Sequence, residues 1–289
     1  MKTALHKINT TDGIVLHGLV YEPDSTTKKV VAHVHGMGGN FYENFFLEPI
    51  ASALTEKGVA FSPFNNRGNG LVTSLINESD GTFNTVEGGT YKERFEDCID
   101  DIKSHIDFLE NQGYEEIHLS GHSLGAPKVV YYITETNDPR VKTLLLLSPS
   151  DMLGLVRGEN SDFQKRISTA HKMISDGKGG EIIPEWVWDE YPITADTFVN
   201  IFADGSKASI FNFLNPNDGF DILSKVSVPI FAVMGTKDDA LTVSIDDTMR
   251  MLKENTKSPE THIMQGASHS YHGHEKELAT LVADWATRN

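Results

Sequence analysis

Gly121-His122-Ser123-Leu124-Gly125 is the stretch of this chain that decides the fold. It follows a short strand-like run, residues 116–120, and leads into a helical pattern that begins at Ala126. A serine at the tip of a sharp strand-to-helix turn needs a strained backbone, and small flanking residues let the strand and the helix pass close together. The first turn of the helix also points free backbone N–H groups at whatever is bound to the serine. The pattern therefore predicts that Ser123 is a nucleophile.

Strand and helix patterns alternate along most of the remaining chain. Strand patterns cover residues 3–9, 14–22, 30–35, 59–64, 116–120, 141–148, 229–234 and 261–264. Helical patterns cover residues 43–57, 91–111, 243–254 and 275–287, besides the helix after Ser123. This alternation predicts an α/β fold with a mostly parallel central sheet, helices on both faces and an antiparallel hairpin at the start.

Two segments interrupt the alternation. Residues 68–90 are polar and rich in glycine, which predicts a long loop at the rim of the pocket. Residues 151–220 contain helical pieces and turns without a clear strand pattern. We therefore expect one catalytic domain whose core consists of residues 1–150 and 221–289, with residues 151–220 inserted as a cap.

Composition narrows the location and the partners of the protein. The 289 residues carry a net charge of −16, which argues against nucleic acid and anionic membrane as partners. No apolar run approaches the roughly 20 residues that span a bilayer, and the first residues do not form a signal peptide. Cys98 is the single cysteine, so no internal disulfide can form. These features predict a cytoplasmic protein.

An acid and a histidine follow two late strands. Gly235-Thr236-Lys237-Asp238-Asp239 comes directly after the strand that ends at Met234, and Gly266-Ala267-Ser268-His269 directly after the strand that ends at Met264. A serine hydroxyl needs an imidazole to take its proton, and the imidazole needs a carboxylate to orient it. Because reacting groups collect at the carboxyl ends of parallel strands, we expect these side chains to meet Ser123.

The chain resembles the α/β-hydrolase fold serine hydrolases, an esterase- and lipase-like superfamily, over nearly its whole length. The matching pieces, in the order of the family, are His35-Gly36-Met37-Gly38-Gly39, Asn66-Arg67-Gly68-Asn69-Gly70, the Ser123 pentapeptide, Gly235-x-x-Asp238 and Gly266-x-x-His269. The long segment 68–90 resembles the branch that contains fusarinine-type siderophore esterases.

The resemblance assigns roles to these residues. It implies that Asp238 rather than Asp239 is the orienting acid and that His269 is the general base. It also implies an oxyanion hole made by the backbone N–H groups of Met37 and Leu124. In this family an insert after the sixth strand forms a lid, and the aromatic residues of that insert are candidates for substrate binding, in particular Trp186, Trp188 and Phe211.

The leading hypothesis is a carboxylic ester hydrolase that forms an acyl-enzyme on Ser123 and acts on a small-molecule ester without cofactor or metal. The alternatives within the same chemistry are thioester, lactone and amide hydrolysis, acting on a natural-product or acyl-CoA substrate. An alternative of another class is a non-catalytic receptor on the same fold. A metal site made by His269, His272 and His274 is a further reading, but the cysteine or acidic ligands that usually complete a zinc site are not evident nearby.

Overall fold

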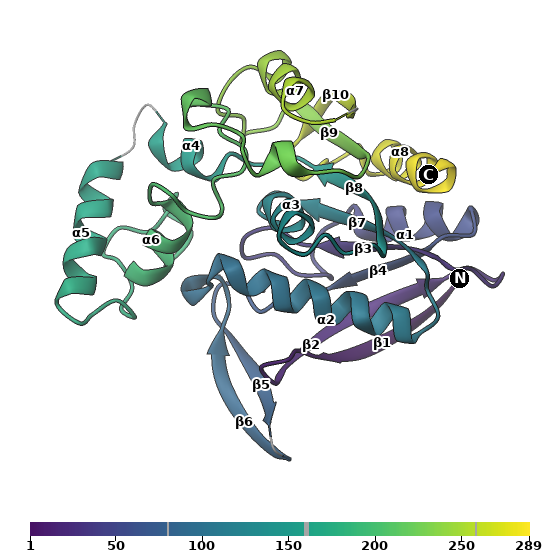
Figure 1. The fold of residues 1–289 in the computed structure, drawn as a ribbon, viewed down its shortest axis with the longest axis horizontal. Coiled ribbons are helices and arrows are strands. Elements are labelled where there is room, and N and C mark those ends of the chain that lie inside the picture. The colour runs from purple at the N-terminus through teal and green to yellow at the C-terminus, as the bar shows by residue number, and fades with distance from the viewer. Residues whose placement is uncertain (80, 159–161, 258) are drawn as a thin grey trace.

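The computed structural model of the chain describes residues 1–79, 81–158, 162–257 and 259–289 (Figure 1). Residue 80, in the predicted loop 68–90, and residues 159–161, in the predicted cap, lie outside the described residues. The strands are β1 (Lys2–Asn9), β2 (Ile14–Glu22), β3 (Lys29–Val34), β4 (Ala60–Phe64), β5 (Thr73–Ser79), β6 (Thr82–Gly88), β7 (Glu116–His122), β8 (Val141–Leu147), β9 (Ile230–Lys237) and β10 (Glu260–Ser268). The α-helices are α1 (Leu47–Glu56), α2 (Cys98–Asn111), α3 (Gly125–Thr136), α4 (Met152–Arg157), α5 (Phe163–Ser175), α6 (Ala195–Phe202), α7 (Ile245–Glu254) and α8 (Glu275–Arg288). Short 3₁₀ turns are η1 (Thr90–Lys92), η2 (Phe95–Asp97), η3 (Pro216–Asp218) and η4 (Leu223–Lys225).

The strands form one sheet in the order β10-β9-β8-β7-β3-β4-β2-β5-β6, and β1 pairs with β2. From β10 to β4 every neighbouring pair is parallel. Strand β2 joins β4, β5 and β1 in antiparallel fashion, and β5 joins β6 in the same way. The prediction of a mostly parallel sheet opened by an antiparallel hairpin is confirmed.

Helices cover both faces of the sheet, as predicted. Strand β3 illustrates the need for helices on both faces, because its valines are fully buried and alternate between two hydrophobic cores. Val30 and Val34 belong to one core, and Val31 belongs to the other. The first core includes apolar residues of α2, α3 and α7, and the second those of α1 and α8. Within the described ranges, no helix is long and apolar enough to cross a membrane.

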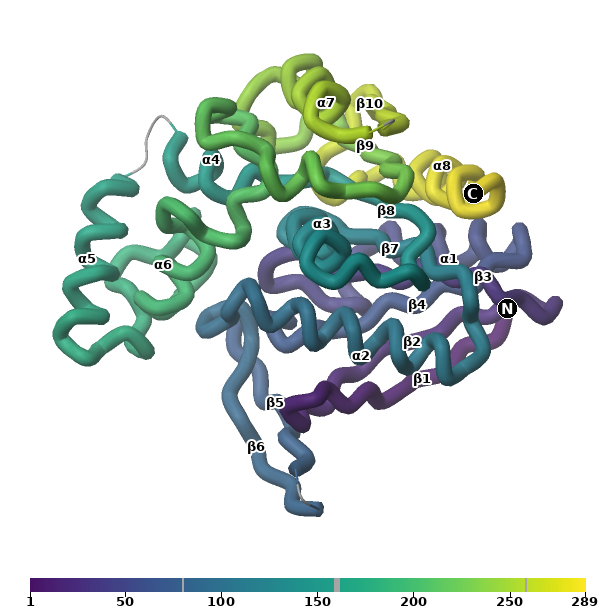
Figure 2. Tube along the Cα trace, in the orientation of Figure 1, coloured from purple at the N-terminus to yellow at the C-terminus, as the bar shows by residue number. Residues whose placement is uncertain are grey.

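The predicted loop over residues 68–90 is wrong for most of its length. Strands β5 and β6 form an antiparallel hairpin, with Thr73 opposite Gly88 and Ser79 opposite Thr82. Most of its side chains are exposed, so the hairpin carries no alternation of apolar residues, and backbone pairing holds it together. Figures 1 and 2 show the hairpin extending away from the body of the molecule. Because it adds two strands, the predicted cap follows the eighth strand in chain order and not the sixth.

Two helices begin later than their patterns predict. Helix α2 begins at Cys98 instead of residue 91, because the backbone before it is bonded to the segment 151–220: Thr194 N–H donates to Tyr91 O at 2.7 Å, and Phe95 N–H donates to Asn200 Oδ1 at 2.8 Å. Helix α1 begins at Leu47 instead of residue 43, after a turn in which Asn40 Oδ1 accepts backbone N–H groups.

The segment 151–220 forms α4, α5 and α6, which lie beyond the end of the sheet at which β8 finishes (Figure 1). Its described part contains isolated bridges, Ile182 with Thr194 and Val187 with Tyr191, but no longer strand. The Asp151 carboxylate fastens the base of the segment. It accepts hydrogen bonds from Gly154 N–H at 2.7 Å, from Leu214 N–H at 2.8 Å and from Thr242 Oγ1 at 3.3 Å.

Candidate active site

Ser123 occupies the turn between β7 and α3. Its φ of +54° lies in the left-handed region that residues with a side chain rarely adopt. Two backbone hydrogen bonds hold this turn: Ser123 N–H donates to Leu147 O at 3.0 Å, and Ala126 N–H donates to Ser123 O at 3.0 Å. The strain predicted for this serine is therefore present, and it fixes the side chain at the carboxyl end of β7.

The glycines on either side of Ser123 are required by close backbone packing. A Cβ atom on Gly121 would lie 2.2 Å from Gly125 O, and a Cβ on Gly125 would lie 2.2 Å from Val34 O. Such contacts are far shorter than any ordinary van der Waals distance, so β7, α3 and β3 can approach each other only with glycine at both positions.

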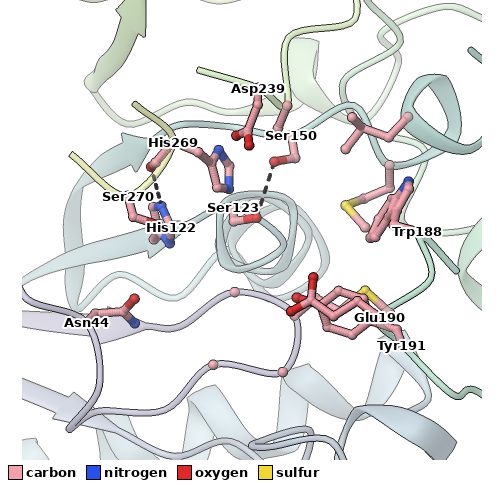
Figure 3. A pocket seen from close by; sticks show the side chains of 17 residues that line it. Asn44, His122, Ser123, Ser150, Trp188, Glu190, Tyr191, Asp239, His269 and Ser270 are labelled. Atoms are coloured by element: carbon pink, nitrogen blue, oxygen red, sulfur yellow. Dashed lines mark hydrogen bonds between the residues drawn. The ribbon is translucent and has the colours of Figure 1, made fainter. Parts of the chain in front are cut away.

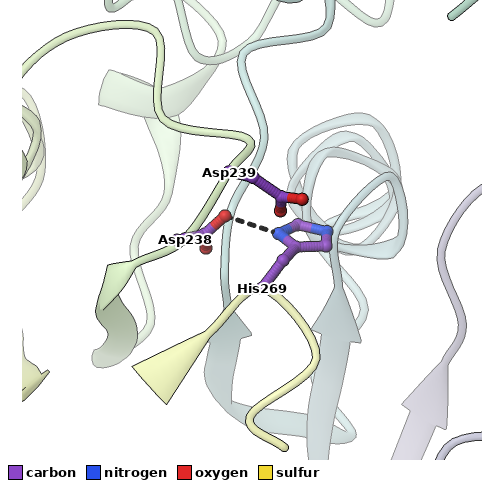
Figure 4. A group of neighbouring side chains, drawn as sticks. All are labelled: Asp238, Asp239 and His269. Carbon is purple, nitrogen blue, oxygen red and sulfur yellow. Dashed lines mark hydrogen bonds and ion pairs between the residues drawn. The ribbon is translucent and has the colours of Figure 1, made fainter. Parts of the chain in front are cut away.

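His269 and Asp238 directly follow β10 and β9. His269 Nδ1 lies 2.8 Å from Asp238 Oδ1, and Figure 4 shows this hydrogen bond. Because an ionised carboxylate only accepts hydrogen bonds, the proton sits on Nδ1 and Nε2 remains an acceptor. In Figure 3 the imidazole points toward Ser123, and both side chains line the same cavity. The structure thus brings Ser123, His269 and Asp238 together.

The environments of the two neighbouring aspartates differ. The Asp238 side chain is completely buried, and its Oδ1 also accepts the N–H of Ala240 at 2.9 Å. Burial alone would raise the pKa of Asp238, but the hydrogen bonds to its carboxylate, chiefly from His269 and also from Ala240 N–H, outweigh burial and hold the pKa below its ordinary value. Asp239 is exposed and faces the cavity. Asp238, and not Asp239, therefore makes the carboxylate contact with the imidazole.

The three histidines of the alternative metal site, His269, His272 and His274, do not gather around one point. His272 Nδ1 lies 3.6 Å from Glu275 Oε1, and His274 Nδ1 lies 3.1 Å from Glu277 Oε2. Asp238, Asp239 and His269 do each offer a ligand atom within 4.8 Å of the others. Within that group, His269 Nδ1 already forms a hydrogen bond with the Asp238 carboxylate.

Sequence reasoning missed Ser150, which contacts the candidate nucleophile. Ser150 is buried, and its Oγ lies 3.3 Å from Ser123 Oγ and donates to Ser148 O at 3.3 Å. In this conformation the described hydrogen-bond partner of Ser123 Oγ is Ser150, not His269. The signal that could have found Ser150 is its place just after the carboxyl end of β8.

Both predicted oxyanion donors belong to backbone that adjoins Ser123: Leu124 is the next residue, and Gly36, the neighbour of Met37, packs so closely that a Cβ on it would lie 2.8 Å from Ser123 Cβ. Among the described residues, neither Met37 N–H nor Leu124 N–H has a hydrogen-bond acceptor. The loop that carries Met37 is closed by Gly39 N–H donating to Gly36 O at 3.1 Å, and is fastened by Gly38 N–H donating to Thr90 Oγ1 at 3.2 Å. Leu124 precedes the first residue of α3, where helix N–H groups lack internal partners.

A cavity of about 440 Å³ opens above Ser123 (Figure 3). Its apolar wall consists of Met37, Met152, Leu155, Trp188 and Tyr191. Its polar lining, besides Ser123 and His269, includes Asn44, His122, Ser150, Glu190, Asp239 and Ser270. The predicted contribution of residues 68–90 to the rim is absent, because the lining contains no described residue of that segment.

The structure separates the three aromatic candidates for substrate binding. Trp188 lines the cavity. Trp186 is exposed and lies outside the lining, and Phe211 is buried, with its ring stacked on Phe213 at 5.6 Å between centroids. Phe211 therefore serves the core of the segment 151–220. Tyr191 and Glu190 take up the cavity positions instead, and no pattern in the sequence distinguished them.

His122 connects the candidate nucleophile to the candidate base. The ring is buried, and its Nε2 lies 2.9 Å from the backbone oxygen of His269. Burial, with the neighbouring His269 ring, lowers the pKa of His122 to about 3, so the ring is neutral and donates this hydrogen bond. The residue before Ser123 thereby fixes the loop that carries His269.

A family model described as "Protein of unknown function (DUF1749)" matches residues 2–286. Comparison with curated protein sequences gives no match.

Solved structures with the same fold include several hydrolases. Est1E from Butyrivibrio proteoclasticus, with ferulic acid bound, is 19% identical with a TM-score of 0.69, and the alignment covers 98% of both chains. The α/β hydrolase GrgF from Penicillium sp. sh18 is 16% identical with a TM-score of 0.70, covering 100% of this chain and 99% of GrgF. An esterase from Pyrococcus furiosus, Pf2001, is 18% identical with a TM-score of 0.62, and the alignment covers 99% of this chain and 90% of Pf2001. The chain therefore has the α/β-hydrolase fold, as the sequence predicted.

Proposed function

The chain belongs to the DUF1749 family, whose members are described as proteins of unknown function, and we propose that it is a serine hydrolase that cleaves carboxylic esters. The observation that carries this proposal is that a strained Ser123 and His269 line one cavity, while the buried Asp238 carboxylate accepts a hydrogen bond from His269 Nδ1. The esterases among the structural neighbours add support at the level of fold.

In the proposed reaction, His269 Nε2 takes the proton of Ser123 Oγ while Oγ attacks the carbonyl carbon of the ester. Asp238 keeps the Nδ1 proton in place and stabilises the imidazolium that forms. The backbone N–H groups of Met37 and Leu124 donate to the developing oxyanion. His269 then protonates the departing alcohol, and a water molecule, activated by the same ring, releases the acid from Ser123.

The segment 151–220 is proposed as a cap over this site. Trp188 and Tyr191 bring its aromatic rings to the cavity, where they would pack on an apolar part of the ester. Thioesters, lactones and amides share this chemistry, so they are tested beside oxygen esters.

The test combines a fluorophosphonate probe with p-nitrophenyl acetate, butyrate and octanoate, for wild type and Ser123→Ala. We expect labelling and hydrolysis in wild type, and a loss of at least about 10³-fold in the variant, because the nucleophile is gone. The control is Ser168→Ala, which removes an exposed hydroxyl from α5 that bonds only the local Gln164 O. Absence of both labelling and turnover in wild type overturns the proposal in favour of a ligand receptor on this fold.

A further inference from the structure

A strained turn of the segment 151–220 faces the candidate nucleophile. Val187 N–H and Tyr191 N–H exchange hydrogen bonds with each other's carbonyl oxygens at 3.0 and 2.9 Å, and Glu190 N–H donates to Val187 O at 3.1 Å. The two central residues, Trp188 and Asp189, have φ of +53° and +56°. Such turns favour glycine and asparagine, and a bulky residue at positive φ is an outlier that points to a function.

This strained turn places three side chains at the cavity. Trp188, Glu190 and Tyr191 all line it, and Figure 3 shows them across from Ser123. The Trp188 and Tyr191 rings are perpendicular, with centroids 5.7 Å apart. Tyr191 packs so closely on Gly38, next to the Met37 N–H, that a Cβ on Gly38 would lie 2.9 Å from Tyr191 Cε1. The turn is thus seated directly on the loop that would hold the oxyanion.

Apart from histidines, the charged side chains that line the described cavity are all acidic. They are Glu190 and Asp239, and no described lysine or arginine lines the cavity. The whole chain adds a net charge of −16. Carboxylates attract a cation and repel an anion, and the faces of tryptophan and tyrosine rings attract cations as well.

We infer that Glu190, with Trp188 and Tyr191, selects the substrate by charge: the site takes esters with a cationic or neutral group and rejects anionic ones, including acyl-CoA thioesters. The inference rests on the proposed function, whose substrate class it narrows. Asp239 contributes to the same selection from the other side of Ser123.

The first experiment compares three p-nitrophenyl esters of similar shape: 4-(trimethylammonio)butanoate, its neutral carbon isostere 5,5-dimethylhexanoate, and the anionic hemiglutarate. A second set places the charge in the alcohol, with butyrylcholine and its neutral isostere 3,3-dimethylbutyl butyrate. A third compares butyryl-CoA with the neutral thioester S-butyryl-N-acetylcysteamine. We expect kcat/KM for the cationic acyl ester to exceed that for the anionic one by about 10-fold at low salt, and less at high salt. The neutral thioester should exceed butyryl-CoA by at least about 10-fold.

The decisive variant is Glu190→Gln, which should reduce the cationic-to-anionic ratio to about 3-fold. The matched control is Asp189→Asn, which removes the adjacent charge from the same turn but from a residue outside the cavity lining, and should leave the ratio unchanged. Hydrolysis without discrimination by charge, or equal use of butyryl-CoA and its neutral analogue, overturns this inference alone. A ratio that Glu190→Gln does not change overturns the assignment to Glu190. Absence of hydrolysis of every ester and of fluorophosphonate labelling overturns the proposed function as well.

Discussion

Gly125→Ala tests whether the turn at Ser123 depends on backbone contact between α3 and β3. The new Cβ would lie 2.2 Å from Val34 O and 2.8 Å from His35 O. Since an ordinary contact begins near 3.4 Å, α3 and β3 would have to separate by about 1 Å. Overpacking of this size against backbone, which cannot rotate away, should cost about 3 kcal/mol of unfolding free energy.

The assay is urea unfolding, supported by thermal unfolding, where we expect a loss of roughly 5 °C in Tm. Gly180→Ala is the matched control, because nothing lies within 4 Å of its would-be Cβ and its φ is not left-handed. That control should stay within about 1 kcal/mol of wild type. A Gly125→Ala protein as stable as the control, with undiminished fluorophosphonate labelling, would refute the packing argument.

Two further predictions concern the site and the buried histidines. Asp238→Asn should lower kcat for a neutral ester by at least about 10³-fold, because His269 loses the carboxylate that orients it. Asp239→Asn should change kcat by less than about 10-fold, and equal losses in the two variants would contradict the assignment of the acid. Burial lowers the pKa of His35, His105 and His122 to about 3, below the ordinary 6.5. Below pH 6.5 these rings gain a proton in the unfolded chain but not in the folded protein, so the free energy of unfolding is highest above pH 6.5 and falls as the pH falls toward 3. Urea unfolding should show lower stability at pH 5.5 than at pH 7.5, by on the order of 1 kcal/mol for each of these rings, and equal stability at the two pH values would contradict it.

The sequence was most informative where local backbone geometry and function demand the same residues. Gly121 and Gly125 flank Ser123 because three backbones meet there, and Asp238 and His269 follow strands because parallel strands end at one edge. Spacing indicated the glycines around Ser123 and an acid and a histidine after late strands, whereas the choice of Asp238 over Asp239 and of His269 among three histidines rested on the family resemblance.

The parts of the fold and of the candidate site that the sequence did not predict depend on contacts that no local pattern specifies. Strands β5 and β6 are mostly exposed and are held by backbone pairing, so apolar periodicity could not predict them. Glu190 reaches the cavity through the placement of the turn at Trp188, and an aromatic count could not tell buried Phe211 from the cavity-lining Trp188. These assignments needed the tertiary arrangement.

The Asp151 carboxylate makes the segment 151–220 an exchangeable module. One side chain accepts hydrogen bonds from near both ends of the segment, from Gly154 N–H and Leu214 N–H, so the chain leaves and rejoins the core at a fixed point. For a loop whose ends are already fixed, doubling its length costs only about 0.6 kcal/mol of closure entropy. The chain between these two points can therefore be lengthened or replaced while β8 and β9 keep their register.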